Sequence, residues 1–264
     1  MNSVISADGT PIAYERSGGQ GPPIILTAPA LGDRTTMRAL AAHLARYTTV
    51  INYDRRGRGD SGDPGAYTVA GEIGDLAALI AEAGGQAALY GHSSGAALAL
   101  HAAAAGLPVT GLVLHEPPFA QDGDGAAARR IAADVAALLA QGRRAEAITS
   151  FLTPTGLPAE LVARMSVDPA ALANAHTLPH DPFEVLSEES RGGRTPEEQA
   201  RRVGVPALVV CGGAGPPWMI ETGQRIAEAM PKGRLLLLPG EGHIVPAEVL
   251  GPVLARFAAT LPGT

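Results

Sequence analysis

The chain has a single cysteine, Cys211, which excludes an internal disulfide. No Cys-x-x-Cys pair or cysteine–histidine cluster is present at the spacing of a metal site. We therefore expect no metal site, and the serine chemistry inferred below needs no cofactor. Cys211 ends the apolar run ALVVC at 207–211, a pattern typical of a buried thiol without a chemical role.

The chain also lacks a basic excess and a long apolar run. Its net charge is -6, so no broad surface for nucleic acid is expected. The most apolar stretch, 96–109, is short and is interrupted by His101, which argues against a membrane span. The first residues do not have the pattern of a signal peptide. We expect a cytoplasmic protein with a small-molecule substrate, and the sequence leaves a homodimer open.

What is present is an alternation of short apolar runs and longer helical patterns. Near-continuous apolar strands between helices are typical of a mostly parallel sheet with both faces covered. The first two runs flank Asp8-Gly9 and are expected to form an antiparallel hairpin. The expected class is α/β, with eight strands at 3–7, 11–16, 24–29, 49–57, 87–92, 111–119, 206–213 and 234–240.

The alternation breaks in the segment 119–202, which has two or three helical patterns and no convincing strand. We interpret this segment as a helical cap inserted into the domain. The predicted α/β core is then formed by 1–118 and 203–264.

The segment GHSSG at 91–95 lies between a predicted strand and a predicted helix. It fits G-x-S-x-G, a sharp turn that lifts a serine hydroxyl clear of the sheet. Ser93 is therefore the candidate nucleophile, and the backbone N–H of Ser94 is a candidate donor to a developing oxyanion. A five-residue motif with two free positions also occurs by chance, but the strand before it and the helix after it favour a nucleophile elbow.

Several segments together resemble the α/β-hydrolase fold over nearly the whole chain. They are the N-terminal hairpin, APALG at 28–32, DRRGRGDSG at 54–62, GHSSG and PGEGHIVP at 239–246. The resemblance implies that His243, the histidine after the last strand, is the catalytic base. It also implies a second oxyanion donor in the loop after the first parallel strand, with Ala30 favoured by register and Leu31 next to it. We interpret 54–62 as a structural loop, because no step of acyl transfer needs charges there.

The usual carboxylate of this fold is missing. It would follow the strand at 206–213 near Gly215, and Glu221 already lies inside the next helix. The neighbouring strand ends at Glu116, and parallel strands end along one edge of a sheet. Glu116 can thus reach His243 and hold the imidazole as a triad acid does. The alternative is that Glu116 pairs with an arginine or caps the insertion.

This arrangement resembles the zearalenone-type lactonases, which take their acid from the same strand. The resemblance rests on HEPPF at 115–119, on SSGA at 93–96 and on the acid-free loop. These are short motifs, and they do not establish the substrate.

A substrate pocket is expected between the elbow and the cap. Its predicted residues are apolar and come from the cap or from loops at the carboxyl edge of the sheet: Leu31, Phe119, Met165, Leu178, Trp218 and Met219. The alternative for Trp218 and Met219 is that they only pack the cap against the core.

The sequence favours a serine hydrolase that cleaves a carboxylic ester or lactone of an apolar small molecule. Serine at position 93 argues against haloalkane dehalogenases and epoxide hydrolases, whose elbows carry aspartate. A carbon–carbon bond hydrolase or a haloperoxidase-like enzyme remains an alternative, because both use similar triads. A ligand-binding or cyclase-like descendant that does not hydrolyse esters is a further alternative.

Overall fold

In the computed structural model of the chain, residues 1–19, 21–119, 125–181 and 183–261 are described. They contain one eight-stranded sheet with the order β1-β2-β4-β3-β5-β6-β7-β8. Its strands are β1 (Asn2–Ile5), β2 (Pro11–Ser17), β3 (Ile24–Thr27), β4 (Val50–Tyr53), β5 (Ala87–His92), β6 (Val109–His115), β7 (Ala207–Gly212) and β8 (Gly233–Leu238).

The strand directions follow the apolar patterns. Strands β3, β4, β5 and β6 are buried at every position, and β3 to β8 pair in parallel. Strands β1 and β2 form the antiparallel hairpin, and β2 pairs antiparallel with β4. The predicted α/β fold with a mostly parallel eight-stranded sheet is confirmed.

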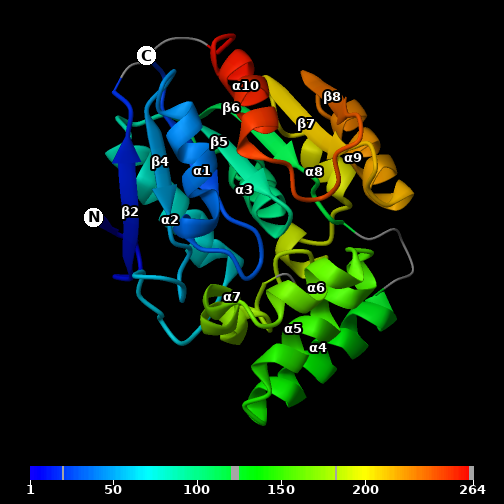
Figure 1. The fold of residues 1–264 in the computed structure, drawn as a ribbon. Helices are drawn as coiled ribbons and strands as arrows, with labels where there is room; N and C mark the ends of the chain where they lie inside the picture. The colour runs from blue at the N-terminus through cyan, green and yellow to red at the C-terminus, as the bar shows by residue number, and fades with distance from the viewer. Residues whose placement is uncertain (20, 120–124, 182, 262–264) are drawn as a thin grey trace.

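Helices cover both faces of this sheet. On one face, α1 (Arg34–Leu44) packs against α10 (Ala247–Ala258), as Figure 1 shows in blue and red. On the other face lie α2 (Val69–Glu82), α3 (Ser94–Ala104) and α9 (Pro217–Ala229). No helix in the described part of the chain is both long and apolar enough to cross a membrane.

The segment between β6 and β7 forms the helical insertion beyond the carboxyl edge of the sheet (Figure 1). Its helices are α4 (Gly125–Ala140), α5 (Arg144–Leu152), α6 (Ala159–Met165), α7 (Pro169–Asn174) and α8 (Pro196–Ala200), with three 3₁₀ turns, η1 (Thr153–Thr155), η2 (Ala175–Thr177) and η3 (Glu189–Arg191). The described part of this segment therefore contains more helices than the two or three predicted from the sequence, and several of them are short. A separate apolar cluster packs α4–α7 together.

The end of the predicted insertion lies against the core. Helix α8 contacts α3 and α9, although the sequence analysis assigned its residues to the cap. Residues 120–124 and 182 of the predicted insertion lie outside the described residues.

Candidate active site

Ser93 occupies a sharp turn between β5 and α3. Its backbone has φ 55° and ψ -123°, a conformation that non-glycine residues rarely adopt. A Cβ at Gly91 would clash with the backbone of Gly95, and one at Gly95 would clash with the carbonyl oxygens of Thr27 and Ala28. The two motif glycines thus permit the tight approach of α3 to the sheet that the elbow requires.

Positive φ angles gather at this edge of the sheet. Among the described residues, the non-glycine positions with positive φ are Leu31 (65°), Ser93 (55°) and Glu116 (50°). Each follows a different strand of the parallel sheet, at its carboxyl end. Unfavourable backbone conformations persist where the surroundings hold them, and they cluster at functional sites. The three residues belong to the candidate nucleophile turn, the candidate acid and the loop after β3 that was predicted to hold an oxyanion donor.

Glu116 follows β6 and is fully buried. A short hydrogen bond joins its Oε2 to Nδ1 of His243, and its Oε1 accepts the backbone N–H of Gly212 at 2.7 Å. Burial alone would raise the pKa of Glu116, but His243 and the Gly212 N–H outweigh it and lower this pKa. The buried carboxylate therefore contacts His243 rather than an arginine.

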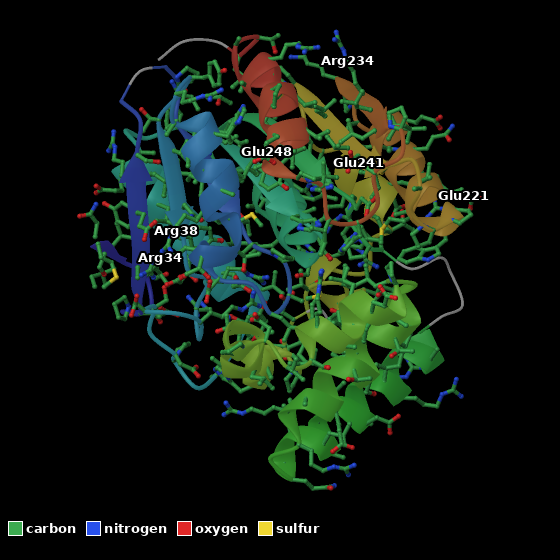
Figure 2. The ribbon with its side chains drawn as sticks, viewed as in Figure 1. Arg34, Arg38, Glu221, Arg234, Glu241 and Glu248 are labelled. Carbon is green, nitrogen blue, oxygen red and sulfur yellow. The ribbon has the colours of Figure 1, made fainter. Side chains whose placement is uncertain are left out.

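The loop after β7 brings the usual acid position to the same place. A Cβ built on Gly215 would lie 3.3 Å from Oε1 of Glu116. Glu221 lies within α9, near the outer edge of the view in Figure 2, and Glu241 lies in the loop between β8 and α10. The carboxylate from the end of β6 thus lies where a side chain from Gly215 would point.

Two further histidines lie beneath His243. Nε2 of His92 is 2.9 Å from the carbonyl oxygen of His243, and the His92 and His115 rings stack with centroids 4.4 Å apart. The hydroxyl of Tyr90 is 2.9 Å from Nδ1 of His115. Burial lowers the pKa of His115 to about 4 and holds that of His92 well below its usual range. Both rings are therefore neutral at neutral pH and add no positive charge beside His243.

The turn after β3 offers two free backbone donors. The Gly32 N–H donates to the Pro29 carbonyl at 3.1 Å, which closes a turn with Ala30 and Leu31 in its middle. The N–H groups of the two central residues are not used by the hydrogen bond that closes such a turn. Ala30 and Leu31 both line the cavity that also contains Ser93.

A buried charge network joins this turn to the elbow. Oδ2 of Asp181 accepts hydrogen bonds from Arg55 and Arg58 at 2.6 Å each and from the hydroxyl of Ser94 at 2.9 Å. Arg55 also forms a bidentate pair with Glu72. The segment 54–62 was interpreted from the sequence as a structural loop, and Asp181 was not among the predicted site residues. The sequence did contain a signal for such a residue: Arg55 and Arg58 directly follow a buried strand, and buried arginines need a buried acidic partner.

One cavity of about 1660 Å³ opens over the elbow. Its wall includes Ser93 and His243, together with five of the predicted pocket residues, Leu31, Phe119, Met165, Trp218 and Met219. Leu178 is instead fully buried in the apolar cluster of the cap and is not part of the cavity wall. The physical reason is that Leu178 follows the 3₁₀ turn η2 and points into the packing of α5 and α7. No group of three or more His, Cys, Asp or Glu side chains in the described residues is arranged to hold a metal ion.

Comparisons with known proteins agree with this architecture. The model of the alpha/beta hydrolase family matches residues 25–251. An alpha/beta hydrolase from Sphaerobacter thermophilus is 44% identical, with a TM-score of 0.86 over 97% of this chain and 99% of that chain. An enol-lactonase from Burkholderia xenovorans is 21% identical, with a TM-score of 0.73 over 98% of this chain and 100% of the other, and this likeness shows the fold alone.

A curated relative matches part of the chain. N-formylmaleamate deformylase of Pseudomonas putida is 36% identical over 123 residues, which cover 45% of this chain and 46% of the deformylase. The matched stretch is thus less than half of either protein.

Proposed function

Because the chain belongs to the alpha/beta hydrolase family, we propose that it is a serine hydrolase that cleaves a carboxylic ester or lactone of an apolar small molecule. The observation that carries the proposal is that Ser93 after β5, Glu116 after β6 and His243 after β8 come together beside one cavity. Ser93 lies in a strained turn on its wall, and His243 lies on the same wall with Nδ1 bonded to the buried Glu116.

In the first half of the proposed reaction, Ser93 Oγ attacks the substrate carbonyl while Nε2 of His243 takes the hydroxyl proton. Negative charge develops on the carbonyl oxygen, and the N–H groups of Ala30 and Ser94 stabilise it. The C–O bond to the leaving group then breaks, and the imidazolium returns its proton to the departing alkoxide. The product is an acyl ester on Ser93 and a free alcohol.

In the second half, His243 takes a proton from water, and the resulting nucleophile attacks the acyl carbonyl. The tetrahedral intermediate collapses, the carboxylic acid leaves and Ser93 regains its proton. Glu116 stays ionised throughout, fixes the tautomer of His243 and stabilises the imidazolium. Its lowered pKa favours the ionised form that this role needs.

The substrate is proposed to be apolar because apolar side chains form most of the cavity wall, with charged side chains such as that of Arg191 also on it. Phe119 and Met219 are buried, and Leu31 and Trp218 also lie on this wall. Esters and lactones are favoured by the sequence motifs, including the short segments that resemble zearalenone-type lactonases. A second candidate is hydrolysis of an N-formyl amide, which the partial identity to the deformylase favours. Cleavage of a carbon–carbon bond uses the same groups and stays an alternative.

The proposal is tested by labelling with a fluorophosphonate, followed by a substrate panel. Wild-type protein should be labelled, and Ser93→Ala should not, because only an activated serine reacts. The panel consists of p-nitrophenyl esters, macrolactones, an N-formyl amide and a diketone for carbon–carbon cleavage. Turnover of esters or lactones above the other classes supports the proposal. An unlabelled wild-type protein would instead favour a ligand-binding descendant of the fold.

A further inference from the structure

One carboxylate of the cap, that of Asp181, is hydrogen-bonded to Ser94 and to Arg58, the arginine that contacts the turn after β3. Asp181 lies in the insertion between η2 and η3 and is buried. Its Oδ2 accepts the Ser94 hydroxyl at 2.9 Å and an N–H of Arg58 at 2.6 Å. Ser94 begins α3 directly after the candidate nucleophile. Asp181 therefore fixes the first residue of the helix whose N–H is proposed to face the oxyanion.

Arg58 connects Asp181 to the peptide group of the second proposed donor, Ala30. Its Nη1 donates to the carbonyl oxygens of Pro29 at 2.9 Å and of Gly32 at 3.2 Å, the two ends of the turn after β3. The Pro29 carbonyl and the Ala30 N–H belong to one planar peptide group and point in opposite directions. A guanidinium that holds this carbonyl from one side thus directs the Ala30 N–H to the other side. The charge on Arg58 also polarises the peptide and strengthens its N–H as a donor.

The cap holds the same turn at a second point. Nδ2 of Asn174, at the end of α7, donates to the carbonyl oxygen of Leu31 at 3.0 Å. The turn carries Leu31 at φ 65°, a conformation that needs support from its surroundings. The side chains of Arg58, Asn174 and Asp181 that make these contacts are all buried.

Resting on the proposed function, we propose that Asp181 is a positioning residue for the oxyanion hole: it orients the Ala30 N–H through Arg58 and the Ser94 N–H through the Ser94 hydroxyl. Asp181 touches neither substrate nor Ser93 in this role. Burial would raise the pKa of Asp181, but Arg55 and Arg58 outweigh it and lower this pKa, so the carboxylate is ionised at neutral pH. An ionised acceptor is needed here because a single oxygen receives three donors.

The test compares Asp181→Asn with a matched control. Asp75 is equally buried and forms a bidentate pair with Arg56, a neighbour of Arg58 in the chain, at 2.7 and 2.8 Å. Asp75→Asn removes a buried carboxylate from an arginine of the same loop, but neither partner contacts Ser94 or the turn at 29–32. Three quantities are measured on the best ester of the panel: kcat per fluorophosphonate-titrated site, KM, and the Kd of an arylboronic acid that forms a tetrahedral adduct with Ser93. Trp218, the one tryptophan of the chain, lines the cavity and reports binding by fluorescence.

Asp181→Asn should lower kcat by about tenfold to a hundredfold, less than the effect of removing an oxyanion donor outright. KM should change by less than about threefold, and boronate affinity should fall by the same factor as kcat/KM. Asp75→Asn should change neither kcat nor boronate affinity by more than about threefold. Equal effects of the two substitutions, or normal kcat in Asp181→Asn, would overturn the positioning role.

Two further variants keep the test decisive where Asp181→Asn does not fold. Ser94→Ala removes one of the three donors to Asp181, and Arg58→Lys keeps the charge but cannot hold both carbonyl oxygens and the carboxylate. Each should lower kcat and boronate affinity together by about threefold to thirtyfold, and normal values in both would overturn the inference. A wild-type protein that neither turns over an ester nor binds the boronate would overturn the proposed function itself. An active wild type with unaffected variants would overturn only the role of Asp181.

Discussion

Nδ1 of His243 and Oε2 of Glu116 are hydrogen-bonded although 127 residues separate them in the chain. The contact exists because β6, β7 and β8 are consecutive parallel strands that end at the same edge of the sheet, with Glu116 directly after β6 and His243 in the loop after β8. Gly212 at the end of β7 donates its N–H to the same carboxylate. The sheet thus lets a carboxylate from β6 reach His243, with the β7 backbone holding it in place, which is the arrangement that the proposed triad uses.

Glu116→Gln should lower kcat by about 10³–10⁴-fold on an ester substrate, as for other triad acids. The amide cannot stabilise an imidazolium and can present its NH₂ group to Nδ1, which favours the wrong tautomer. Steady-state kinetics on the purified variant measure the effect. A decrease smaller than about threefold would show that another group supports His243.

Adding Gly215→Asp to Glu116→Ala should restore part of the lost kcat. The new side chain would start 3.3 Å from the position vacated by Oε1, and Gly215 does not have the positive φ that would exclude aspartate. The double variant is compared with Glu116→Ala alone. Identical rates in the two would indicate that the strand ends are not interchangeable for His243.

Two substitutions of Ser93 should have the same effect on turnover but different effects on the free energy of unfolding. Ser93→Ala should abolish turnover, and Ser93→Gly should do the same while being more stable than Ser93→Ala by about 1 kcal/mol. Glycine adopts φ 55° without the penalty that a Cβ brings. Urea unfolding of both variants measures the difference. An alanine variant as stable as the glycine variant would mean that the elbow holds no strain at this residue.

The free energy of unfolding should fall as the pH is lowered from about 6.5 to about 4. His115 has a folded pKa of about 4, whereas an unfolded histidine titrates near 6.5. Between these values the unfolded chain binds a proton that the folded chain excludes, so acid favours unfolding by up to about 1.4 kcal/mol per pH unit from His115. The buried His92, also with a lowered pKa, adds to the slope with the same sign.

The measurement is urea unfolding at several pH values with His115→Gln beside wild type. The glutamine variant should lose stability less steeply, because the titrating ring is gone while a polar partner for Tyr90 remains. His176 is exposed, so His176→Gln serves as the control for replacing a histidine outside the core. Parallel curves for wild type and His115→Gln would contradict the prediction.

Trp218→Ala should raise KM or change substrate preference more than it destabilises the fold. The side chain lines the cavity and is only half-buried, unlike the neighbouring Met219. Removing a fully buried tryptophan would destabilise by about 3–5 kcal/mol, and a smaller loss is expected here. Kinetics across the ester panel and thermal unfolding measure the two effects. A stable variant with unchanged kinetics on every active ester would place Trp218 outside both the site and the core.

The strands were predictable from the sequence because their apolar runs are continuous and sharply bounded. The run AALYGH coincides with β5, and its position before a serine–glycine turn located the elbow. The contact between Glu116 and the end of β7 was predictable for a related reason: once two apolar runs are assigned to neighbouring parallel strands, their ends must meet. The cap was harder, because α6, α7 and α8 have seven, six and five residues, too few to display a helical period over two full turns.

The contacts of Arg55, Arg58 and Asp181 near the turn at 29–32 were not predictable in the same way. Arg55 and Asp181 are 126 residues apart, and no local pattern records that they meet. A lone aspartate in a cap segment resembles a solvent-exposed residue when only the sequence is read. The misplacement of Leu178 has a similar origin, because apolarity alone does not say whether a side chain faces a cavity or its neighbouring helices.

With Glu116 after β6 as the proposed acid, the segment 213–217 carries no proposed catalytic group, yet Pro216 and Pro217 belong to the cavity wall. The residues proposed for bond cleavage and this part of the cavity wall therefore come from separate stretches of the chain. Diversity introduced at 216 and 217 should reshape the cavity wall while Ser93, Glu116 and His243 keep their positions. Three neighbouring glycines are unsuitable: Gly212 binds Glu116, and a Cβ at Gly213 or Gly215 would lie 3.2 Å from a backbone carbonyl oxygen. A library that spares these three glycines is a direct route to new substrate preferences in this scaffold.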